Sequence, residues 1–358
     1  MKSLKSILAL SFLFLTATSS LVCSDGLERK DLNEDVVKTV VVSPNGAANF
    51  KTIQEAIDYI PSGNSNWIKI ILSPGIYNEK IVIPKEKQKI IMQGNSASEV
   101  TIQYNDAGLS NSSGPITVNA EYFVAINITF KNYNCSYSTP IIPYEEIKVA
   151  PSIILMADMA WFYGCNFISV QDTLADLLGR HYFRNCYIEG AIDFIWGNGQ
   201  SIYQNCVINV KGVTSKGVVK GGGMLPGFIT AQGRENEKET SGFVFKNCVI
   251  NGDGMASLGR AYRGYSRVVF YETNIANIIV PQGWDAWDYK GQEDKFTYAE
   301  VNCIGEGANK SGRVMWEKNL SAQEIDFLIE PKTFIDEDGW MGSLPSSLVS
   351  LLSPSSIF

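Results

Sequence analysis

The hexapeptide FYGCNF at residues 162–167 recurs through the middle of this 358-residue chain. It returns as FRNCYI at 183–188, YQNCVI at 203–208 and FKNCVI at 245–250. FYETNI at 270–275 is a fifth copy in which threonine replaces the cysteine. Successive cysteines are 21, 20 and 42 residues apart, so the period is about 21 residues with one copy skipped. Self-similarity at a fixed period of this length is typical of repeat architectures.

The repeated unit has the composition of a β-strand. Each copy is short, alternating and rich in aromatic and β-branched residues, and the connections are rich in Gly and Asn. No long amphipathic helix separates the copies. We therefore predict an all-β fold, a right-handed single-stranded parallel β-helix in which each period forms one coil. The pattern alone leaves a β-sandwich as the alternative.

The two ends of the repeat region carry different signals. In residues 52–57 (TIQEAI), Thr52 is followed three residues later by Glu55, which is the signature of a capping box. We expect a short helix there, covering the N-terminal end of the solenoid, whose open edge needs a cap. We expect one β-helix domain over residues 25–341 and a Ser-rich, loosely ordered tail over residues 342–358.

Residues 1–24 have the features of a secretory signal peptide. Lys2 and Lys5 precede an apolar run from Ile7 to Ala17, and small residues follow. The run is too short for a comfortable membrane span, although a membrane anchor remains the alternative. We therefore expect a secreted protein that does not span a membrane. Secretion would make five Asn-x-Ser/Thr sequons glycosylation candidates: Asn111, Asn127, Asn134, Asn309 and Asn319. Asn127 lies in a strand-like run, so it is the weakest of the five.

Composition excludes several classes of function. The formal net charge is −7, which argues against a nucleic-acid-binding protein, since these need a basic face. His181 is the single histidine, so an HExxH zinc site is excluded and a Ser-His-Asp triad would have to use it. No CxxC pair occurs, which makes a zinc site a poor interpretation of the cysteines. Carboxylates remain the expected acid–base groups, and we expect His181 to be structural.

The period brings two of those carboxylates together. Asp172 and Asp193 are 21 residues apart, and residues one period apart stack on neighbouring coils at roughly 4.8 Å. Gln171 adjoins Asp172, so an amide would lie beside the pair. Two carboxylates this close do not both ionise easily, so one is suited to act as nucleophile and the other as acid. The residues alone would also suit a glycosidase.

Several motifs in order resemble those of plant pectinesterases (pectin methylesterases), which are secreted carbohydrate esterases with a parallel β-helical fold. GIYNE at 75–79 resembles the family's GxYxE segment, and QDTL at 171–174 matches its QDTL motif. DFIWG at 193–197 resembles DFIFG, and LGRAY at 258–262 resembles LGRPW with two changes. GW at 283–284 resembles the segment that follows. The resemblance covers about residues 40–341.

The resemblance implies roles for these residues. Asp193 would be the nucleophile that attacks a methyl galacturonate ester, and Asp172 the general acid and then the general base. Gln171 would help to hold the oxyanion, and Arg260 would keep Asp193 ionised and oriented. No metal or organic cofactor is implied. The expected binding partners are pectin and, at family level, a proteinaceous pectinesterase inhibitor, and a monomer in the cell wall is expected.

Further side chains are assigned less directly. Aromatic faces suit pyranose rings, so Tyr262, Trp284 and Trp196 are candidates for a sugar-binding groove, with Tyr77 of the GIYNE segment as a fourth. Cys165 and Cys186 are one period apart and would stack on adjacent coils. They would form either a disulfide or two buried free thiols in a cysteine ladder.

One position departs from the family pattern. The family has a second glutamine, in a QAVA segment 22 residues before the glutamine of QDTL, and here Val149 occupies that position. Valine cannot donate a hydrogen bond to an oxyanion, and loss of one such donor typically costs about 10²–10³ in rate. A catalytically impaired pectin-binding wall protein is therefore the main alternative. A polygalacturonase or lyase on the same fold, and an esterase for another acyl group, are further alternatives.

Overall fold

The computed structural model describes residues 36–46, 48–135, 141–215, 224–349 and 351. The chain divides into residues 1–32 and a unit of residues 33–358, and all described residues belong to the second unit. The expected signal peptide lies outside the described residues. In the described part of the chain, no helix has both the length and the apolar character needed to cross a membrane.

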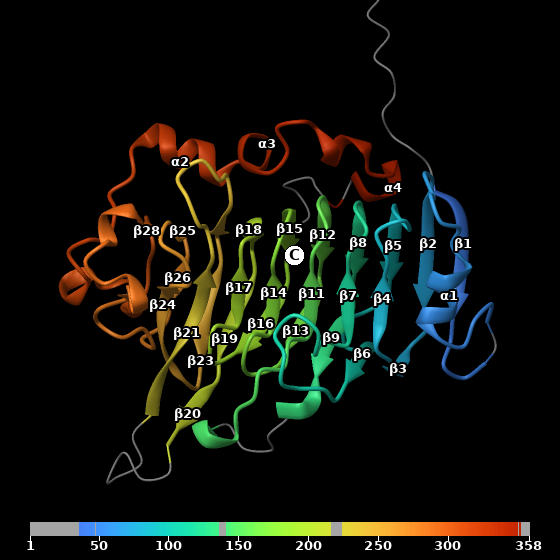
Figure 1. Ribbon diagram of the computed structural model, residues 1–358, viewed down its shortest axis with the longest axis horizontal. Coiled ribbons are helices and arrows are strands. Elements are labelled where there is room, and N and C mark those ends of the chain that lie inside the picture. The colour runs from blue at the N-terminus through green and yellow to red at the C-terminus, as the bar shows by residue number, and fades with distance from the viewer. Residues whose placement is uncertain (1–35, 47, 136–140, 216–223, 350, 352–358) are drawn as a thin grey trace, which may run out of the picture. The chain divides into compact units, whose positions relative to one another are not determined.

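Three parallel sheets form the walls of the second unit (Figure 1). Sheet I contains, in spatial order, β1 (Val36–Val42), β2 (Trp67–Leu72), β5 (Ile90–Gln93), β8 (Phe123–Ile126), β12 (Ala160–Tyr163), β15 (Arg180–Arg184), β18 (Gln200–Gln204), β22 (Gly242–Lys246), β25 (Arg267–Tyr271) and β28 (Thr297–Val301). Sheet II contains β3 (Gly75–Asn78), β6 (Val100–Tyr104), β9 (Thr129–Asn132), β13 (Asn166–Ile168), β16 (Tyr187–Gly190), β19 (Val207–Val210), β23 (Val249–Gly252) and β26 (Asn274–Ile275).

Sheet III completes each coil and carries the candidate site. It contains β4 (Ile81–Ile83), β7 (Ile116–Val118), β11 (Ile153–Leu155), β14 (Leu174–Asp176), β17 (Ile195–Gly197), β21 (Met224–Gln232), β24 (Met255–Ala261) and β27 (Trp284–Asp285), with β10 (Ile141–Pro143) and β20 (Gly212–Thr214) beside β21. The chain visits sheets I, II and III in turn, and every strand pair except β20–β21 is parallel. The predicted right-handed parallel β-helix is confirmed.

The repeated hexapeptide builds the interior of these coils. Its first aromatic residue lies in sheet I at the same register in successive coils, from Phe162 through Phe183 to Tyr203. The rings stack face to face with centroids 4.9 and 4.6 Å apart, and the stack continues to Phe245 and Phe270. The period seen in the sequence is therefore the rise of one coil.

The cysteines of the repeat form a second ladder, at the turn between sheets I and II. Cys165, Cys186, Cys206, Cys248 and Cys303 are all free thiols. Each donates to a backbone carbonyl of the preceding coil, as Cys186 Sγ does to Phe162 O at 3.6 Å. In the fifth copy, the Thr273 hydroxyl makes the equivalent contact to Phe245 O.

The disulfide expected as one option for Cys165 and Cys186 is therefore not formed. Equivalent side chains on neighbouring coils point the same way at about 4.8 Å, whereas a disulfide needs Cβ atoms about 3.8 Å apart and facing each other. The buried free thiols correspond to the other option.

A short helix closes the N-terminal end of the coils, as predicted. Helix α1 (Ile53–Tyr59) begins at Thr52, whose side chain accepts from Glu55 N, while the Glu55 carboxylate accepts from Thr52 N. Its buried side chains, Ile53, Ala56 and Ile57, join the main core. Short 3₁₀ segments occur in the loops: Tyr133–Cys135, Tyr144–Glu146, Trp287–Tyr289, Glu293–Lys295, Glu306–Ala308 and Lys310–Gly312.

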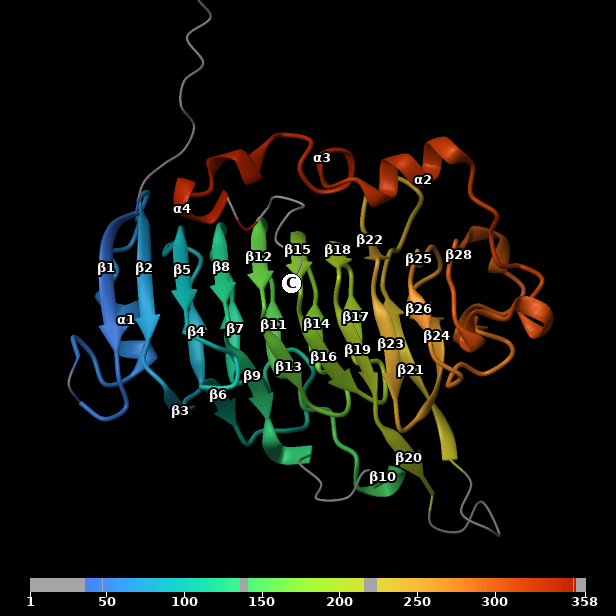
Figure 2. The same ribbon diagram turned by 180° about the vertical axis from the view of Figure 1, so that it is seen from behind.

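The C-terminal segment packs along the outer face of sheet I. It contains α2 (Ala322–Ile329), α3 (Pro331–Phe334), a 3₁₀ turn at Trp340–Ser343 and α4 (Ser346–Val349), and Figures 1 and 2 show it running back over the sheet. Leu344 is fully buried and Trp67 Nε1 donates to Ser343 O, so the loosely ordered tail expected from Gly342 is wrong for residues 342–349. The Ser-rich composition of this segment did not indicate that Leu344 and Leu348 are buried in the same hydrophobic cluster.

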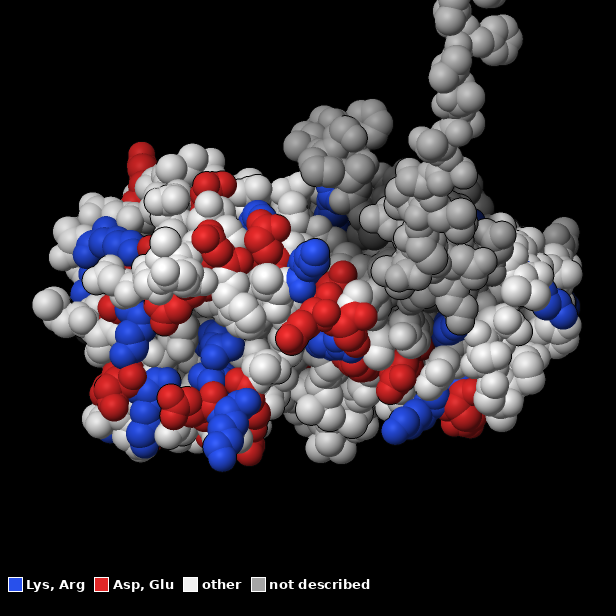
Figure 3. All heavy atoms as spheres, turned by 90° about the horizontal axis from the view of Figure 1, so that it is seen from above, with Lys and Arg blue, Asp and Glu red and all other residues white. Residues whose placement is uncertain are grey.

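The charges on this face are mixed. Figure 3 looks onto the side that carries the C-terminal segment, and Lys and Arg side chains are interspersed there with Asp and Glu. The described residues of this face therefore present charges of both signs.

Candidate active site

The register of sheet III sets the two candidate aspartates on neighbouring coils. Asp172 and Asp193 each precede a strand by two residues, and those strands pair Leu174 with Ile195. A bridge joins Gln171 to Ile192, and Asp172 N donates to Ile192 O at 3.1 Å. The spacing of 21 residues therefore corresponds to one coil, as predicted.

Both aspartates have an uncommon backbone conformation. Their φ angles are 60° and 48°, in the left-handed region that side-chain-bearing residues seldom adopt. Asp tolerates this region better than most residues. Each of the two residues is only 7% exposed. Strained, buried carboxylates of this kind are found preferentially at functional sites.

Arg260 approaches the pair from two strands further along sheet III. Its Nε donates to Asp193 Oδ1 at 2.7 Å, and its terminal nitrogen contacts Asp193 Oδ2, which makes a bidentate pair. The guanidinium lies over the Trp287 ring, 3.6 Å from the centroid, and over the Phe228 ring at 4.2 Å. Stacking and pairing together hold this cation in one orientation.

The surroundings make the two carboxyl groups different. The pKa of Asp172 is raised to about 8, chiefly by burial and then by the charge of Asp193, against a lowering by Arg260. Burial also raises the pKa of Asp193, but its hydrogen bonds to Arg260 and the charge of Arg260 act in the opposite direction. Because Arg260 bonds only to Asp193, the arrangement favours a protonated Asp172 beside an ionised Asp193.

A cavity of about 290 Å³ opens onto these groups. Its lining consists of Ser110, Gln171, Asp172, Asp193, Trp196, Ala231, Arg260, Tyr262 and Trp287. All four predicted catalytic residues meet there, together with two of the predicted sugar-binding aromatics. Trp196 and Tyr262 meet edge to face with ring centroids 6.0 Å apart, and Tyr262 lies 6.2 Å from Trp287.

Two of the predicted substrate-binding residues lie elsewhere. Tyr77 is 2% exposed, and its hydroxyl donates to the carbonyls of Val42 and Ser73. Trp284 is also 2% exposed and stacks on Tyr298 in the core. Neither lines the cavity, and both residues pack in the core.

Sequence reasoning missed Trp287 and Ser110. Trp287 follows Trp284 by three residues in a segment without strand periodicity, so no pattern in the sequence distinguishes the two. Ser110 lies in a loop of small polar residues, where no motif distinguishes it from its neighbours.

Val149 occupies the position assigned to it. A parallel bridge pairs it with Gln171, one coil further along the chain. Val149 itself does not line the cavity. The residue beside Gln171 on the preceding coil is therefore a valine, which has no amide to donate.

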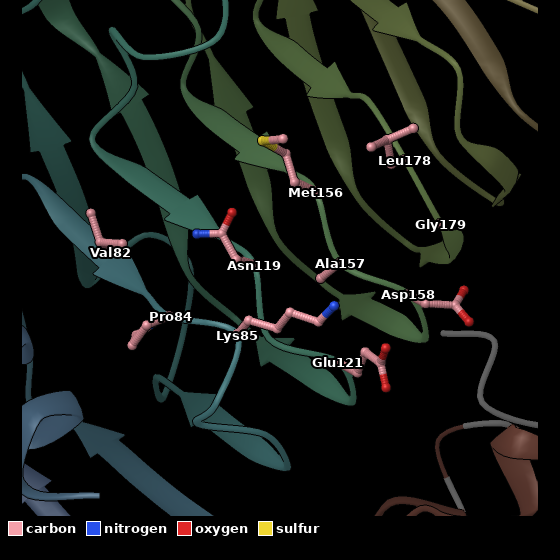
Figure 4. Close-up of a pocket in the computed structure, with 10 residues that line it drawn as sticks. All are labelled: Val82, Pro84, Lys85, Asn119, Glu121, Met156, Ala157, Asp158, Leu178 and Gly179. Carbon is pink, nitrogen blue, oxygen red and sulfur yellow. The ribbon is translucent and has the colours of Figure 1, made fainter. Parts of the chain in front are cut away.

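A larger cavity, of about 540 Å³, lies where β4, β7, β11 and β14 end (Figure 4). Val82, Met156 and Leu178 give it an apolar part, and Lys85 extends across it towards Ala157. It contains none of the candidate catalytic residues. In the described part of the chain, no group of three or more His, Cys, Asp or Glu side chains is arranged to hold a metal ion.

Comparison with known proteins agrees with this geometry. Residues 39–338 match the family model described as Pectinesterase. The chain is 43% identical over 309 residues to "Probable pectinesterase 29" of Arabidopsis thaliana, covering 86% of this chain and 89% of the relative. It is 36% identical over 319 residues to "Pectinesterase QRT1" of the same plant, covering 86% and 80%.

Solved structures show the same fold. The pectin methylesterase from carrot superposes with a TM-score of 0.76 at 28% identity, covering 89% of this chain and 97% of that one. The pectin methylesterase from Aspergillus niger superposes with a TM-score of 0.71 at 26% identity, covering 88% and 99%. Fold and sequence together define a carboxylic ester hydrolase built on a parallel β-helix. This chain belongs to the pectinesterase family.

Proposed function

We propose that this protein hydrolyses the methyl esters of homogalacturonan, releasing methanol and leaving de-esterified pectin, in plant cell wall modification. The observation that carries the proposal is the juxtaposition of Asp172, Asp193 and Arg260 in one small cavity. Family membership supports the reaction class, and the geometry supports the assignment of roles.

In the proposed first half-reaction, a carboxylate oxygen of Asp193 attacks the ester carbonyl carbon. The carbonyl oxygen becomes an oxyanion, to which the Gln171 amide donates a hydrogen bond. Asp172 then gives its proton to the methoxy oxygen, and methanol leaves as the C–O bond breaks. The product of this half-reaction is an acyl-enzyme anhydride on Asp193, with Asp172 ionised.

The second half-reaction restores both groups. Asp172 takes a proton from water, and the resulting hydroxide attacks the acyl carbon. The bond to Asp193 breaks, which regenerates its carboxylate beside Arg260 and releases the galacturonate product. The raised pKa of Asp172 supports this role, because a group that is protonated near pH 7 can act first as acid and then as base.

The aromatic side chains support a carbohydrate substrate. Trp196, Tyr262 and Trp287 line one side of the cavity, next to the reactive carboxylates. Flat aromatic faces suit pyranose rings, and these three rings would position the uronate ring whose ester reacts. Trp196 and Tyr262 belong to the set that the sequence predicted, and Trp287 joins them in place of Trp284 and Tyr77.

We further propose a secreted, glycosylated, monomeric protein. Asn111, Asn309 and Asn319 are exposed, which fits glycan attachment. The side-chain amides of Asn127 and Asn134 donate to Asn95 O and Asn105 Oδ1, so these two are poorer acceptors. A proteinaceous pectinesterase inhibitor remains a proposed partner.

The first experiment is methanol release from highly methylated pectin by the purified protein, with viscosity recorded in parallel. The parent should release methanol at constant viscosity. Asp193→Asn and Asp172→Asn should abolish release, whereas Asp253→Asn, which removes an exposed carboxylate outside the cavity lining, should not. A rapid fall in viscosity would instead indicate a polygalacturonase or lyase.

Val149 favours one second candidate, a pectin-binding wall protein with impaired catalysis. That function predicts polymer binding without methanol release from a folded parent. Retention on immobilised pectin, measured beside methanol release, separates the two functions. Failure of the parent in both assays would contradict both.

A further inference from the structure

The proposed esterase has an incomplete oxyanion site at the position of Val149. On the coil before Gln171, an isopropyl group stands where an amide donor is expected, and it does not reach the cavity surface. Gln171 alone would then face the oxyanion. Oxyanion sites commonly combine two donors, so a second donor is to be sought on this side of the cavity.

Ser110 is the polar side chain that lines the cavity there without an assigned role. It is half-buried, and within the described residues its hydroxyl has no hydrogen-bond partner. A hydroxyl carries one donor proton and rotates freely about its C–O bond, so it can be directed at a charge that develops nearby.

The loop that carries Ser110 is fixed to the coil of Val149. Gly108 N donates to Val149 O at 2.9 Å. The Nδ2 atom of Asn132, a residue only 1% exposed, lies 2.8 Å from both Asp106 O and Ser113 O and 3.0 Å from Pro151 O. Both ends of the loop are therefore tied to the segment that follows Val149.

The loop is also closed on itself. Leu109 N donates to Ser113 Oγ at 3.1 Å, and Ser113 N donates to Leu109 O at 3.0 Å. Ser110 is thus held within a tight turn on a clamped loop. Because the loop backbone is fixed, only the Ser110 hydroxyl has to rotate to meet charge that develops in the transition state, and the loop does not have to move.

We propose that Ser110 is a catalytic residue that supplies the second oxyanion hydrogen bond in place of the missing glutamine. Its O–H donates to the ester oxygen as Asp193 attacks, and the proton stays on Ser110 throughout. The inference rests on the proposed esterase function. It explains how the proposed esterase can be active with valine at position 149.

The test is a kinetic cycle on methyl-esterified pectin, with thermal melting to confirm that every variant is folded. Ser110→Ala should lower kcat by about 10–100-fold and leave KM within about twofold, because the contact forms only in the transition state. Ser110→Thr should keep most of kcat. Ser112→Ala, which removes an exposed hydroxyl two residues away and preserves the Asn111 sequon, is the matched control.

The cycle is completed by Val149→Gln in the parent and in Ser110→Ala. If both positions serve one oxyanion, the glutamine should raise kcat more in Ser110→Ala than in the parent. Equal effects in the two backgrounds, a Ser110→Ala kcat within twofold of the parent, or a change confined to KM would overturn the proposal. A parent without methanol release would instead contradict the proposed function itself.

Discussion

Arg260 donates from Nε to Asp193 Oδ1 at 2.7 Å while its terminal nitrogen contacts Oδ2, so two side chains 67 residues apart form one bidentate pair. The pair joins two coils that are separated by strand β21. Its position favours ionisation of Asp193 over Asp172, although both residues are buried to the same degree.

Replacement of Arg260 by glutamine should reveal this role in the pH profile. Without the guanidinium, the pKa of Asp193 rises, so less of the nucleophile is ionised at low pH. We expect kcat to fall about 100-fold at pH 7 and by a larger factor at pH 5, where less of Asp193 is ionised. The measurement is the pH–rate profile of Arg260→Gln beside Arg263→Gln, whose exposed pair with Glu235 lies outside the cavity lining. An unshifted acidic limb would contradict the assignment.

The raised pKa of Asp172 should set the alkaline limit of the proposed activity. Because the proton donor is lost when Asp172 ionises, kcat/KM should fall above about pH 8, by roughly tenfold per pH unit. Initial rates of methanol release between pH 6 and pH 10 check this. A rate that stays constant up to pH 10 would exclude Asp172 as the acid.

The same group should make stability depend on pH. The folded-state pKa of Asp172, about 8, lies above the ordinary value of 3.8, so its contribution is fully present below pH 3.8 and is lost as the pH rises through 8. Asp172→Asn cannot lose a proton. We therefore expect its melting temperature to match the parent at pH 4 and to exceed it increasingly towards pH 8. Asp253→Asn is the control, and a difference independent of pH would contradict the prediction.

His181 should be a buried cation. Its Nδ1 lies 2.5 Å from Asp176 Oδ1 and its Nε2 lies 2.7 Å from Ala157 O, so both ring nitrogens face acceptors. Burial lowers the pKa of His181, but Asp176, Ala157 and the charge of Asp158 raise it above 6.5 overall. Tyr203 completes the cluster by donating to Asp176 Oδ2 at 2.6 Å.

Loss of this imidazolium should destabilise the fold strongly. His181→Gln leaves the buried Asp176 without its cation, which costs about 3 kcal/mol when one partner of a buried pair is removed. The contribution of His181 is fully present below pH 6.5 and is lost as the pH rises through its raised pKa. Urea unfolding of parent and variant at pH 6 and pH 9 should therefore show a larger difference at pH 6. Equal differences would mean that the histidine is neutral.

The thiols of the cysteine ladder should not react with alkylating reagents in the native protein. Burial raises the pKa of Cys165, Cys186 and Cys206 well above the usual range, so little thiolate forms. Peptide mapping after alkylation should find these three unmodified in the folded protein and modified in urea without reductant. Labelling that requires a reductant in urea would show that a disulfide exists after all.

The coil architecture and the proximity of the candidate catalytic pair could be predicted from sequence because both follow the period. An aromatic residue and a cysteine repeat at the same offset, and the distance between Asp172 and Asp193 equals that offset. A single register then fixes both the core and the proximity of the two carboxylates.

The rest of the site could not be predicted because it lies in loops that have no period. Trp284 and Trp287 differ by three residues, yet one is packed on Tyr298 and the other lies under Arg260. Tyr77 belongs to a motif-like segment, but its side chain is turned into the core. Ser110 lies on a loop that Asn132 and Val149 hold in place, through contacts between distant residues that no local pattern encodes.

The C-terminal segment gives the molecule a property that a stack of coils does not have by itself. In a solenoid each repeat contacts only its neighbours, so end coils can fray one at a time. Here the chain leaves the coil of β28 and returns along sheet I, burying Leu344 and Trp340 in one cluster with Trp67 of the early strand β2 and Trp161 of the middle strand β12. Opening an early coil therefore requires release of the last part of the chain. Unfolding of the first and last coils becomes a single cooperative event. The coils that carry Asp172 and Asp193 lie between these two ends, which the C-terminal segment connects.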